Sequence, residues 1–462
     1  MWEIELQRQS EISLKRQIYA ALRDKILNGK LPAGEALPST RQLAMALNVS
    51  RNTINEAYDM LIAEGYIHSS QGAPSRIADG LQLSPKPNGG MNETDEPAAS
   101  FLADFRTGQP DLRQFPRYSW QQIAQKKMRD MTADQFGYTG PQGMSELREE
   151  ISAWLYRSKA LAVHPRDIFI TAGATHALHV VADLMFQDAR ELLVEDPCNI
   201  HMLQTFINKG YAVRGIPVDR EGLRTELLDG RPGSLVYVTP SHQFPLGGIL
   251  PAFRRAGLIR FARENGSYIV EDDYDSEFRY YGAPVSPLYA MDPERVIYVG
   301  TFSKVLFPGL RIGYVVLPAE LHNRWRRLRT YTDVQNPPFE QAALAEFLRT
   351  RKFDKHIGKM RKVYRERREA LLSALKEYFG TGWQPWGDAA GLHLAVDFQD
   401  MVFDEPWMKA SRQHKIRVTP VDYHCIRKGA HPHKLLFGYG HLEPGEICKG
   451  MEVLHQFFEK GL

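Results

Sequence analysis

The first 30 or so residues alternate apolar and polar positions with the period of a helix. One apolar stripe recurs every four residues, at Leu14, Ile18, Leu22 and Ile26. Gly29 and Pro32 follow this stripe and are typical stop signals. The pattern predicts one amphipathic helix that packs a single face against a small core.

Two shorter helical patterns follow. Ser39 and Gln42 have the spacing of a capping box and predict the start of one helix, whose apolar residues are Leu43, Ala44 and Leu47. After a short turn, Ser50 can cap the next helix, whose buried stripe is expected at Ile54, Ala57, Tyr58 and Leu61. Two helices joined by a tight turn, followed by a strand–turn–strand pattern over residues 66–77, predict a winged helix-turn-helix.

Such a unit binds double-stranded DNA with the start of its second helix in the major groove. Arg51 and Asn52 occupy that start, and their side chains suit guanine and adenine edges respectively. Phosphate contacts are expected from Ser39, Arg41, Ser50 and Thr53, with Gly72 near the tip of the wing. The alternative is a plain three-helix bundle with arginines on its surface.

The remainder of the chain has a different pattern. Residues 79–102 are rich in Gly, Pro, Ser and Asn, which predicts a flexible linker after a DNA-binding domain at 1–78. From 103 to 462, short β-branched runs alternate with longer helical patterns, as in the segments DIFITAG, ELLVEDP, SLVYVTP, YIVEDDY and RVIYVGT. This alternation predicts an α/β domain built on a mostly parallel sheet.

One lysine stands at the end of a predicted strand in the segment TFSKVLFPGLRIGY. Lys304 follows the strand at 295–300, and α/β sheets place ligands at that edge. Lysine forms Schiff bases with carbonyl compounds, notably pyridoxal phosphate. A phosphate beside it needs hydroxyl groups and a cation, which Thr301, Ser303 and Arg311 supply.

Three other strand ends add matching chemistry. Asp272 suits a protonated pyridine nitrogen, and Tyr274 suits the phenolic oxygen on the same ring. Ala174 and Thr175 open a helix whose N–H groups face an anion, and Gln243 is expected to bond a ring substituent.

Composition restricts the class of protein further. A hydrophobic content of 43% and a charged content of 24% are typical of a globular protein, and neither a membrane span nor an export signal is expected. The net charge is +3, and residues 1–80 hold equal numbers of basic and acidic residues, so DNA binding depends on local placement of arginines. Cys198, Cys425 and Cys448 are expected as reduced thiols in the cytoplasm. The cluster HCIRKGAHPH lacks a standard zinc spacing, so no metal site is predicted.

The segments LPSTRQLAMALNVSRNTINEAY and EGYI closely resemble the winged-helix domain of the GntR family of bacterial regulators. From about residue 104, the segments FRTGQPDLRQFP, YTGPQGMSELR and SK…PGLRIGY resemble fold-type I pyridoxal-phosphate enzymes of the aminotransferase class. Joined by a linker, the two domains resemble the MocR subfamily of GntR regulators, whose members are typically head-to-tail homodimers that sense an amino compound at the cofactor.

The resemblance assigns further roles. It implies that Lys304 binds the cofactor covalently and that Tyr138 reaches the phosphate of the partner subunit. Asn199 stands where the family usually has a ring-stacking tyrosine, and His201 stands where some relatives carry a ligand-binding arginine. Lys434 is the nearest cation to the expected carboxylate position, and Leu246 replaces a small hydroxyl residue.

Three functions remain open on the sequence. The first is a pyridoxal-phosphate-dependent transcription regulator that binds operator DNA and senses an amino compound by Schiff-base exchange. The second is an active aminotransferase with an added DNA-binding domain. The third is a regulator whose large domain only dimerises, against which Lys304, Asp272, Tyr274 and Arg311 together argue.

Overall fold

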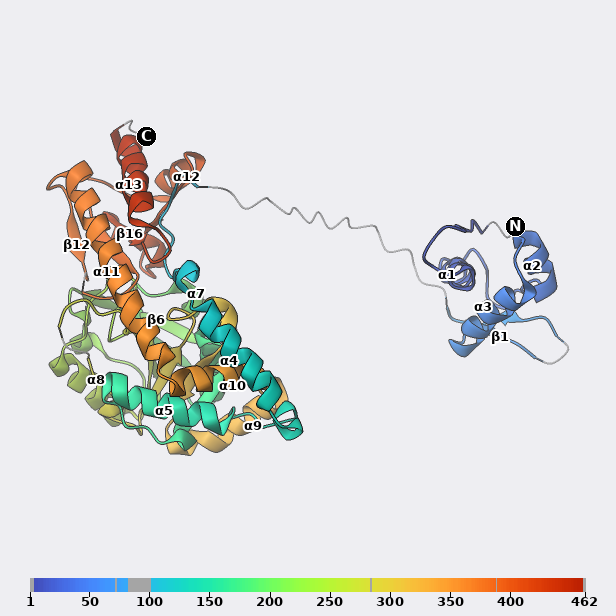
Figure 1. Ribbon diagram of the computed structural model, residues 1–462, viewed down its shortest axis with the longest axis horizontal. Helices are drawn as coiled ribbons and strands as arrows, with labels where there is room; N and C mark the ends of the chain where they lie inside the picture. Colours follow the sequence, from blue (N-terminus) through green and yellow to red (C-terminus); the bar gives the residue numbers. More distant parts are fainter. Residues whose placement is uncertain (1–3, 71–72, 82–100, 283–284, 388, 460–462) are drawn as a thin grey trace. The chain divides into compact units, whose positions relative to one another are not determined.

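The computed structural model describes residues 4–70, 73–81, 101–282, 285–387 and 389–459. The chain divides after Pro97 into two separate units. Figure 1 shows the smaller N-terminal unit in blue and the larger unit from cyan to red.

The N-terminal unit has the helices that the apolar stripes predict. They are α1 (Leu14–Leu27), α2 (Thr40–Leu47) and α3 (Arg51–Ala63). The capping box of Ser39 and Gln42 is present, and the Ser50 side chain accepts a hydrogen bond from the Thr53 amide. Strands β1 (Ile67–His68) and β2 (Arg76–Ile77) pair antiparallel as the wing. The predicted winged helix-turn-helix is therefore confirmed, while Gly72 lies outside the described residues.

An eight-stranded sheet forms the centre of the larger unit. Its order is β4-β11-β10-β9-β8-β5-β6-β7. The strands are β4 (Ile168–Thr171), β5 (Glu191–Asp196), β6 (Ala212–Asp219), β7 (Gly222–Leu223), β8 (Leu235–Val238), β9 (Tyr268–Asp273), β10 (Val296–Thr301) and β11 (Gly313–Val316). The pairs from β6 through β10 are parallel, whereas β11 runs antiparallel to both β10 and β4. The expectation of a mostly parallel α/β sheet is confirmed.

Helices cover both faces of this sheet, which explains the nearly continuous apolar runs in its strands. One face packs against α6 (Ala174–Met185), α7 (Ile200–Lys209) and α9 (His322–Thr332). The other packs against α5 (Ser145–Lys159), α8 (Ala252–Asn265), α10 (Pro338–Arg349) and α11 (Lys352–Phe379). Among the described residues, no helix is both long and apolar enough to cross a bilayer.

The C-terminal part adds a second, smaller sheet. Its strands, in spatial order, are β12 (Gln384–Trp386), β13 (His393–Asp397), β16 (Lys434–Gly438) and β15 (Thr419–Pro420). Helix α13 (Pro444–Glu459) packs against α11, as Figure 1 shows. The other elements are α4 (Arg117–Asp130), α12 (Glu405–Gln413) and the parallel pair β3 (Ala103–Asp104) and β14 (Ile416–Arg417).

Candidate functional site

A cavity of about 430 Å³ lies at the carboxyl ends of the parallel strands. Asp272 comes from the end of β9, Thr301 ends β10, and Tyr237 comes from β8. Ten of the residues selected from the sequence line this cavity: Ala174, Thr175, Asn199, His201, Asp272, Tyr274, Thr301, Ser303, Lys304 and Arg311. The sheet topology therefore brings together segments that are more than a hundred residues apart in the chain.

The amine of Lys304 lies inside this cavity. Its Nζ donates a hydrogen bond to the carbonyl oxygen of Gly108. Burial lowers the pKa of Lys304, while the nearby carboxylates of Asp275 and Asp272 oppose that shift. Gly108 has φ +74°, and a Cβ there would lie 2.6 Å from Nζ, so a side chain at this position would displace the lysine amine. A lysine with a lowered pKa is the kind that attacks a carbonyl carbon.

One carboxylate oxygen of Asp272 is bonded to a neighbour, and the other is available to a bound molecule. The Tyr237 hydroxyl donates to Asp272 Oδ2 at 2.7 Å. Asp272 Oδ1 is buried and, within the described part of the chain, has no hydrogen-bond partner. Burial raises the pKa of Asp272 to about 6, although the bond from Tyr237 acts in the opposite direction. A buried acceptor without a partner suits a cationic N–H donor on a bound molecule.

Other lining residues of the cavity favour an anion. Helix α6 begins at Ala174 after Gly173, which has φ +89°. A Cβ at Gly173 would lie 3.2 Å from Arg311 Nη2, so the guanidinium packs directly against the helix start. Ser303 and Thr301 add hydroxyl groups to the same lining. A helix N-terminus, a guanidinium and hydroxyl groups together are a suitable site for a phosphate.

Three of the selected residues lie outside the lining. Both polar atoms of the Gln243 amide are already bonded: Nε2 donates to the carbonyl groups of Pro197, in the segment after β5, and of Phe244 at 2.8 and 2.7 Å, and Oε1 accepts from the Leu246 amide. The neighbouring Phe244 lines the cavity in its place. Lys434 forms an ion pair of 2.9 Å with Asp397. Tyr138 is 89% exposed.

Asn199 and His201 line the cavity at the start of helix α7. Asn199 is the N-cap of α7, and its Oδ1 accepts a hydrogen bond of 3.1 Å from the His201 amide. The structure adds residues here that the sequence did not single out, among them Arg106, Tyr423 and His424. Arg106 belongs to the segment FRTGQPD, whose only signal was its place in the family pattern. It supplies a guanidinium to the lining in addition to Arg311.

The residues predicted to contact DNA form a separate, largely exposed group on the N-terminal unit. Ser39, Arg41, Ser50, Arg51 and Asn52 are exposed, and Thr53 is half-buried. The Asn52 side chain donates to Glu56 at 2.9 Å, and Arg51 Nε lies 3.4 Å from the Thr40 hydroxyl. Both serine side chains act as helix caps, Ser39 accepting from the Gln42 amide and Ser50 from the Thr53 amide.

These two units define a class of protein, a DNA-binding regulator with an aminotransferase-like domain. Residues 103–430 match the family described as aminotransferase class I and II, and residues 14–77 match the gntR family of bacterial regulatory proteins. The chain is 30% identical to the probable rhizopine catabolism regulatory protein MocR of Rhizobium meliloti, over 98% of this chain and 95% of the relative. It therefore belongs to the MocR-type regulators of the GntR family.

One further relative spans nearly the whole chain, and a solved structure resembles most of it. The chain is 32% identical to the pyridoxine biosynthesis transcriptional regulator PdxR of Corynebacterium glutamicum, over 93% of this chain and 92% of the relative. A multiple substrate aminotransferase from Thermococcus profundus aligns with 79% of this chain and 92% of its own, at 25% identity and a TM-score of 0.72. The family and the fold together imply pyridoxal 5'-phosphate as cofactor, DNA as a partner and a small molecule as effector.

Proposed function

We propose that this protein represses or activates transcription in response to an amino compound that competes with Lys304 for the cofactor. Residues 1–78 form the DNA-binding domain, 79–102 the linker, and 103–462 the effector-binding and dimerisation domain. One observation carries the proposal: a lysine amine of lowered pKa and an unpartnered buried carboxylate oxygen of Asp272 line the same cavity. That pairing suits a pyridine aldehyde, which needs a nucleophilic amine and an acceptor for its ring N–H.

The residues present fit pyridoxal phosphate. Asp272 Oδ1 would accept the ring N–H, the Tyr274 hydroxyl would face the ring oxygen, and Lys304 Nζ would reach the aldehyde carbon. Thr301, Ser303, Arg311 and the amide groups of Ala174 and Thr175 would hold the phosphate. When bound, the cofactor supplies an aldehyde for which the lysine and an external amine compete. Asn199 offers no aromatic face to the ring.

Amine exchange at this site changes which groups contact the cavity walls. A ligand shifts a conformational equilibrium only by its differential affinity for the two states. His201 and Arg106 line the cavity and are suited to an acidic group on the effector. The effector is therefore proposed to be an amino acid or a related amino compound with an anionic group.

The DNA partner is proposed to be a double-stranded operator in the bacterial cytoplasm. Arg51 and Asn52 would contact base edges, and Ser39, Arg41, Ser50 and Thr53 would contact phosphates, as in other helix-turn-helix proteins. A head-to-tail homodimer is proposed as the assembly. The exposed ring of Tyr138 would then contribute to the site of the partner.

An absorption and DNA-binding experiment tests the proposal. Wild-type protein mixed with pyridoxal phosphate should develop a visible absorption band, which Lys304→Ala should abolish and the control Lys409→Ala, on the exposed face of α12, should keep. A panel of amino acids should then change the band and the mobility shift of the DNA upstream of the gene. A protein that stays colourless with excess cofactor would contradict the proposal.

An aminotransferase is a second candidate, and the lowered pKa of the buried Lys304 amine favours it. A lysine of that kind can move a proton as well as form a bond. Repeated turnover of an amino donor to a keto acid, lost in Lys304→Ala, would support this candidate. A single round of spectral change without product accumulation would support the regulator alone.

A further inference from the structure

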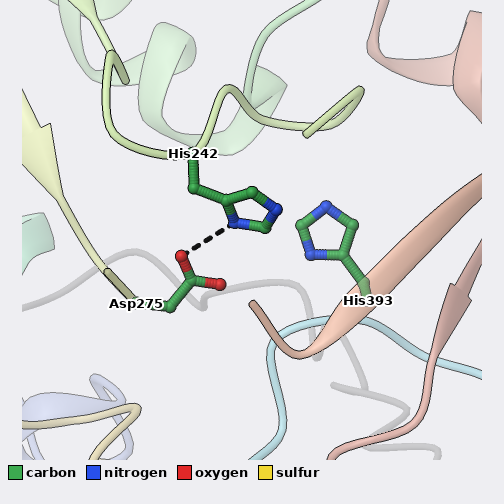
Figure 2. Close-up of side chains that lie close together, drawn as sticks. All are labelled: His242, Asp275 and His393. Carbon is green, nitrogen blue, oxygen red and sulfur yellow. Dashed lines mark hydrogen bonds and ion pairs between the residues drawn. The ribbon is translucent and has the colours of Figure 1, made fainter. Parts of the chain in front are cut away.

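Three buried side chains form a cluster beside the cavity (Figure 2). His242 follows β8, Asp275 follows β9, and His393 lies on β13 of the smaller sheet. Their exposed fractions are 2%, 1% and 3%. The rings of His242 and His393 lie 5.1 Å apart, and Asp275 and His393 also line the cavity. None of these residues has a role in the functions proposed above.

The hydrogen-bond pattern fixes the tautomer of His242. Its Nδ1 lies 2.8 Å from Asp275 Oδ1. A carboxylate oxygen only accepts, so Nδ1 carries the hydrogen and donates it. The Tyr274 hydroxyl oxygen lies 3.0 Å from the same Nδ1. This oxygen therefore accepts from the shared N–H, which leaves the hydroxyl proton of Tyr274 to donate elsewhere.

Because Tyr274 lines the cavity, its hydroxyl proton points into the cavity. Burial first, and then the negative charge of Asp275, raise the pKa of Tyr274 well above its ordinary value. The hydroxyl thus keeps its proton across the physiological range. Phe244 lies against the Tyr274 ring, at 6.2 Å between centroids, and its side chain has no donor of its own.

The backbone at Gly391 leaves space for the His242 ring. Gly391 has φ +85°, and a Cβ at this position would lie 2.0 Å from His242 Cε1. The carbonyl oxygen of Gly391 accepts hydrogen bonds from Tyr280 at 2.6 Å and Tyr439 at 2.8 Å. The ring is therefore held between Asp275 and a backbone segment that is fixed in turn, so its N–H direction is set before any ligand binds.

We propose that His242, oriented by Asp275, is a positioning residue that turns the Tyr274 hydroxyl towards the ring oxygen of the cofactor. This inference rests on the proposed function, since it needs the cofactor in the cavity. A donor to that oxygen stabilises its negative charge and so lowers the proton affinity of the lysine–cofactor linkage beside it. Loss of the positioning should raise that proton affinity.

A transition-metal site is the competing use of the cluster. His242, Asp275 and His393 offer ligand atoms that all lie within 4.8 Å of one another. However, His242 Nδ1 is bound to Asp275, and His393 Nε2 lies 3.1 Å from the Pro245 carbonyl oxygen and donates to it. The positioning role requires only the hydrogen bonds that the structure already shows. Metal binding is therefore one of the outcomes that the experiment distinguishes.

The test is a pH titration of the visible band in cofactor-loaded, full-length protein. His242→Phe should raise the midpoint by about one pH unit, a tenfold change in proton affinity. His242→Asn places an amide N–H near the position of Nδ1 and should restore most of the midpoint. Should the phenylalanine variant not fold, His242→Gln serves as the second loss variant, since its amide reaches only the Nε2 position. The control His356→Gln alters a buried histidine bonded to the Val305 carbonyl, outside the cavity lining.

A double-mutant cycle isolates the coupling between His242 and Tyr274. In a Tyr274→Phe background, His242→Phe should give no further shift, because the hydroxyl it positions is absent. The other titratable and charged groups that face the cavity are common to all four proteins and cancel: Asp272, Asp275, Lys304, His393, His424, His201, Tyr237, Tyr423, Arg106 and Arg311.

Three results would overturn the inference. The first is an unchanged midpoint in His242→Phe or His242→Gln, and the second is an additive shift in the double variant. The third is a midpoint that responds to Zn²⁺, reverses with chelator and loses the response in His393→Phe, which would make the cluster a metal site. A wild-type protein without any visible band would instead contradict the proposed function itself.

Discussion

Asp272→Asn should stabilise the cofactor-free protein while it weakens cofactor binding. Asp272 is a fully buried carboxyl group whose pKa is raised from 3.8 to about 6, chiefly by burial. Its Oδ2 accepts from Tyr237, and its Oδ1 has no partner among the described residues. Asparagine keeps an acceptor for the tyrosine hydroxyl and removes the charge, so the folded chain no longer has to bury an anion.

The magnitude follows from the difference between the two pKa values. At about 1.4 kcal/mol per pH unit, the interval from 3.8 to about 6 corresponds to about 3 kcal/mol of the free energy of unfolding. The folded state binds the proton more tightly, so this stability is fully present below pH 3.8 and is lost as the pH rises to about 6. The advantage of Asp272→Asn over wild type should therefore be largest, about 3 kcal/mol, above pH 6 and should shrink as the pH falls below it.

Urea denaturation of the cofactor-free proteins at pH 5 and pH 7.5, followed by tryptophan fluorescence, measures this difference. Asp273→Asn is the matched control. Burial alone would raise the pKa of Asp273, but the ammonium of Lys159 holds it below its ordinary value. That variant should lose stability rather than gain it. Equal stability of wild type and Asp272→Asn at pH 7.5, or a gain that does not depend on pH, would refute the reasoning. Asp272→Asn should also bind pyridoxal phosphate more weakly, as a titration of the visible band would show.

Two further predictions concern charged side chains. Arg51→Ala should weaken specific operator binding by about 1–3 kcal/mol in a mobility-shift titration, and an unchanged affinity would exclude Arg51 from base recognition. Lys159→Met should lower the free energy of unfolding by about 3–5 kcal/mol, because Glu277, at 3.0 Å from the ammonium, and Asp273 would become buried charges without their cation. A urea midpoint equal to wild type would show that the two carboxyl groups take up protons instead.

The DNA-binding unit could be predicted well because its signals are local. The capping box at Ser39, the cap at Ser50 and the apolar stripe of α3 each act within four residues, and each is present as predicted. The residues at the ends of the strands could be predicted from the sequence equally well. Parallel strands bring their carboxyl ends to one edge, so Asp272 and Thr301 had to lie near each other once both strands joined the same sheet.

The sequence was least informative where the position of a side chain depends on turn geometry or strand register. Gln243 and Phe244 are neighbours, and only the folded turn decides which of them faces the cavity. Lys434 was selected as a nearby cation, but it begins β16 directly opposite Asp397 on β13. That pairing commits its charge within the smaller sheet. The His242 cluster was missed because its three members come from separate elements with no common motif.

The proposed function also needs a route from the cavity towards the linker, and the first strand of the large unit offers one. Strand β3 pairs with β14, the Phe105 amide donates to the Arg417 carbonyl at 2.7 Å, and the same segment continues to Gly108. Lys304 Nζ donates to the Gly108 carbonyl when the amine is free. Under the proposed function, a lysine joined to the cofactor would not make that bond in the same way, whereas a lysine displaced by an amino effector would. The two states would then differ in a contact to the segment that continues back to the linker, and the effector would favour the state in which that contact forms.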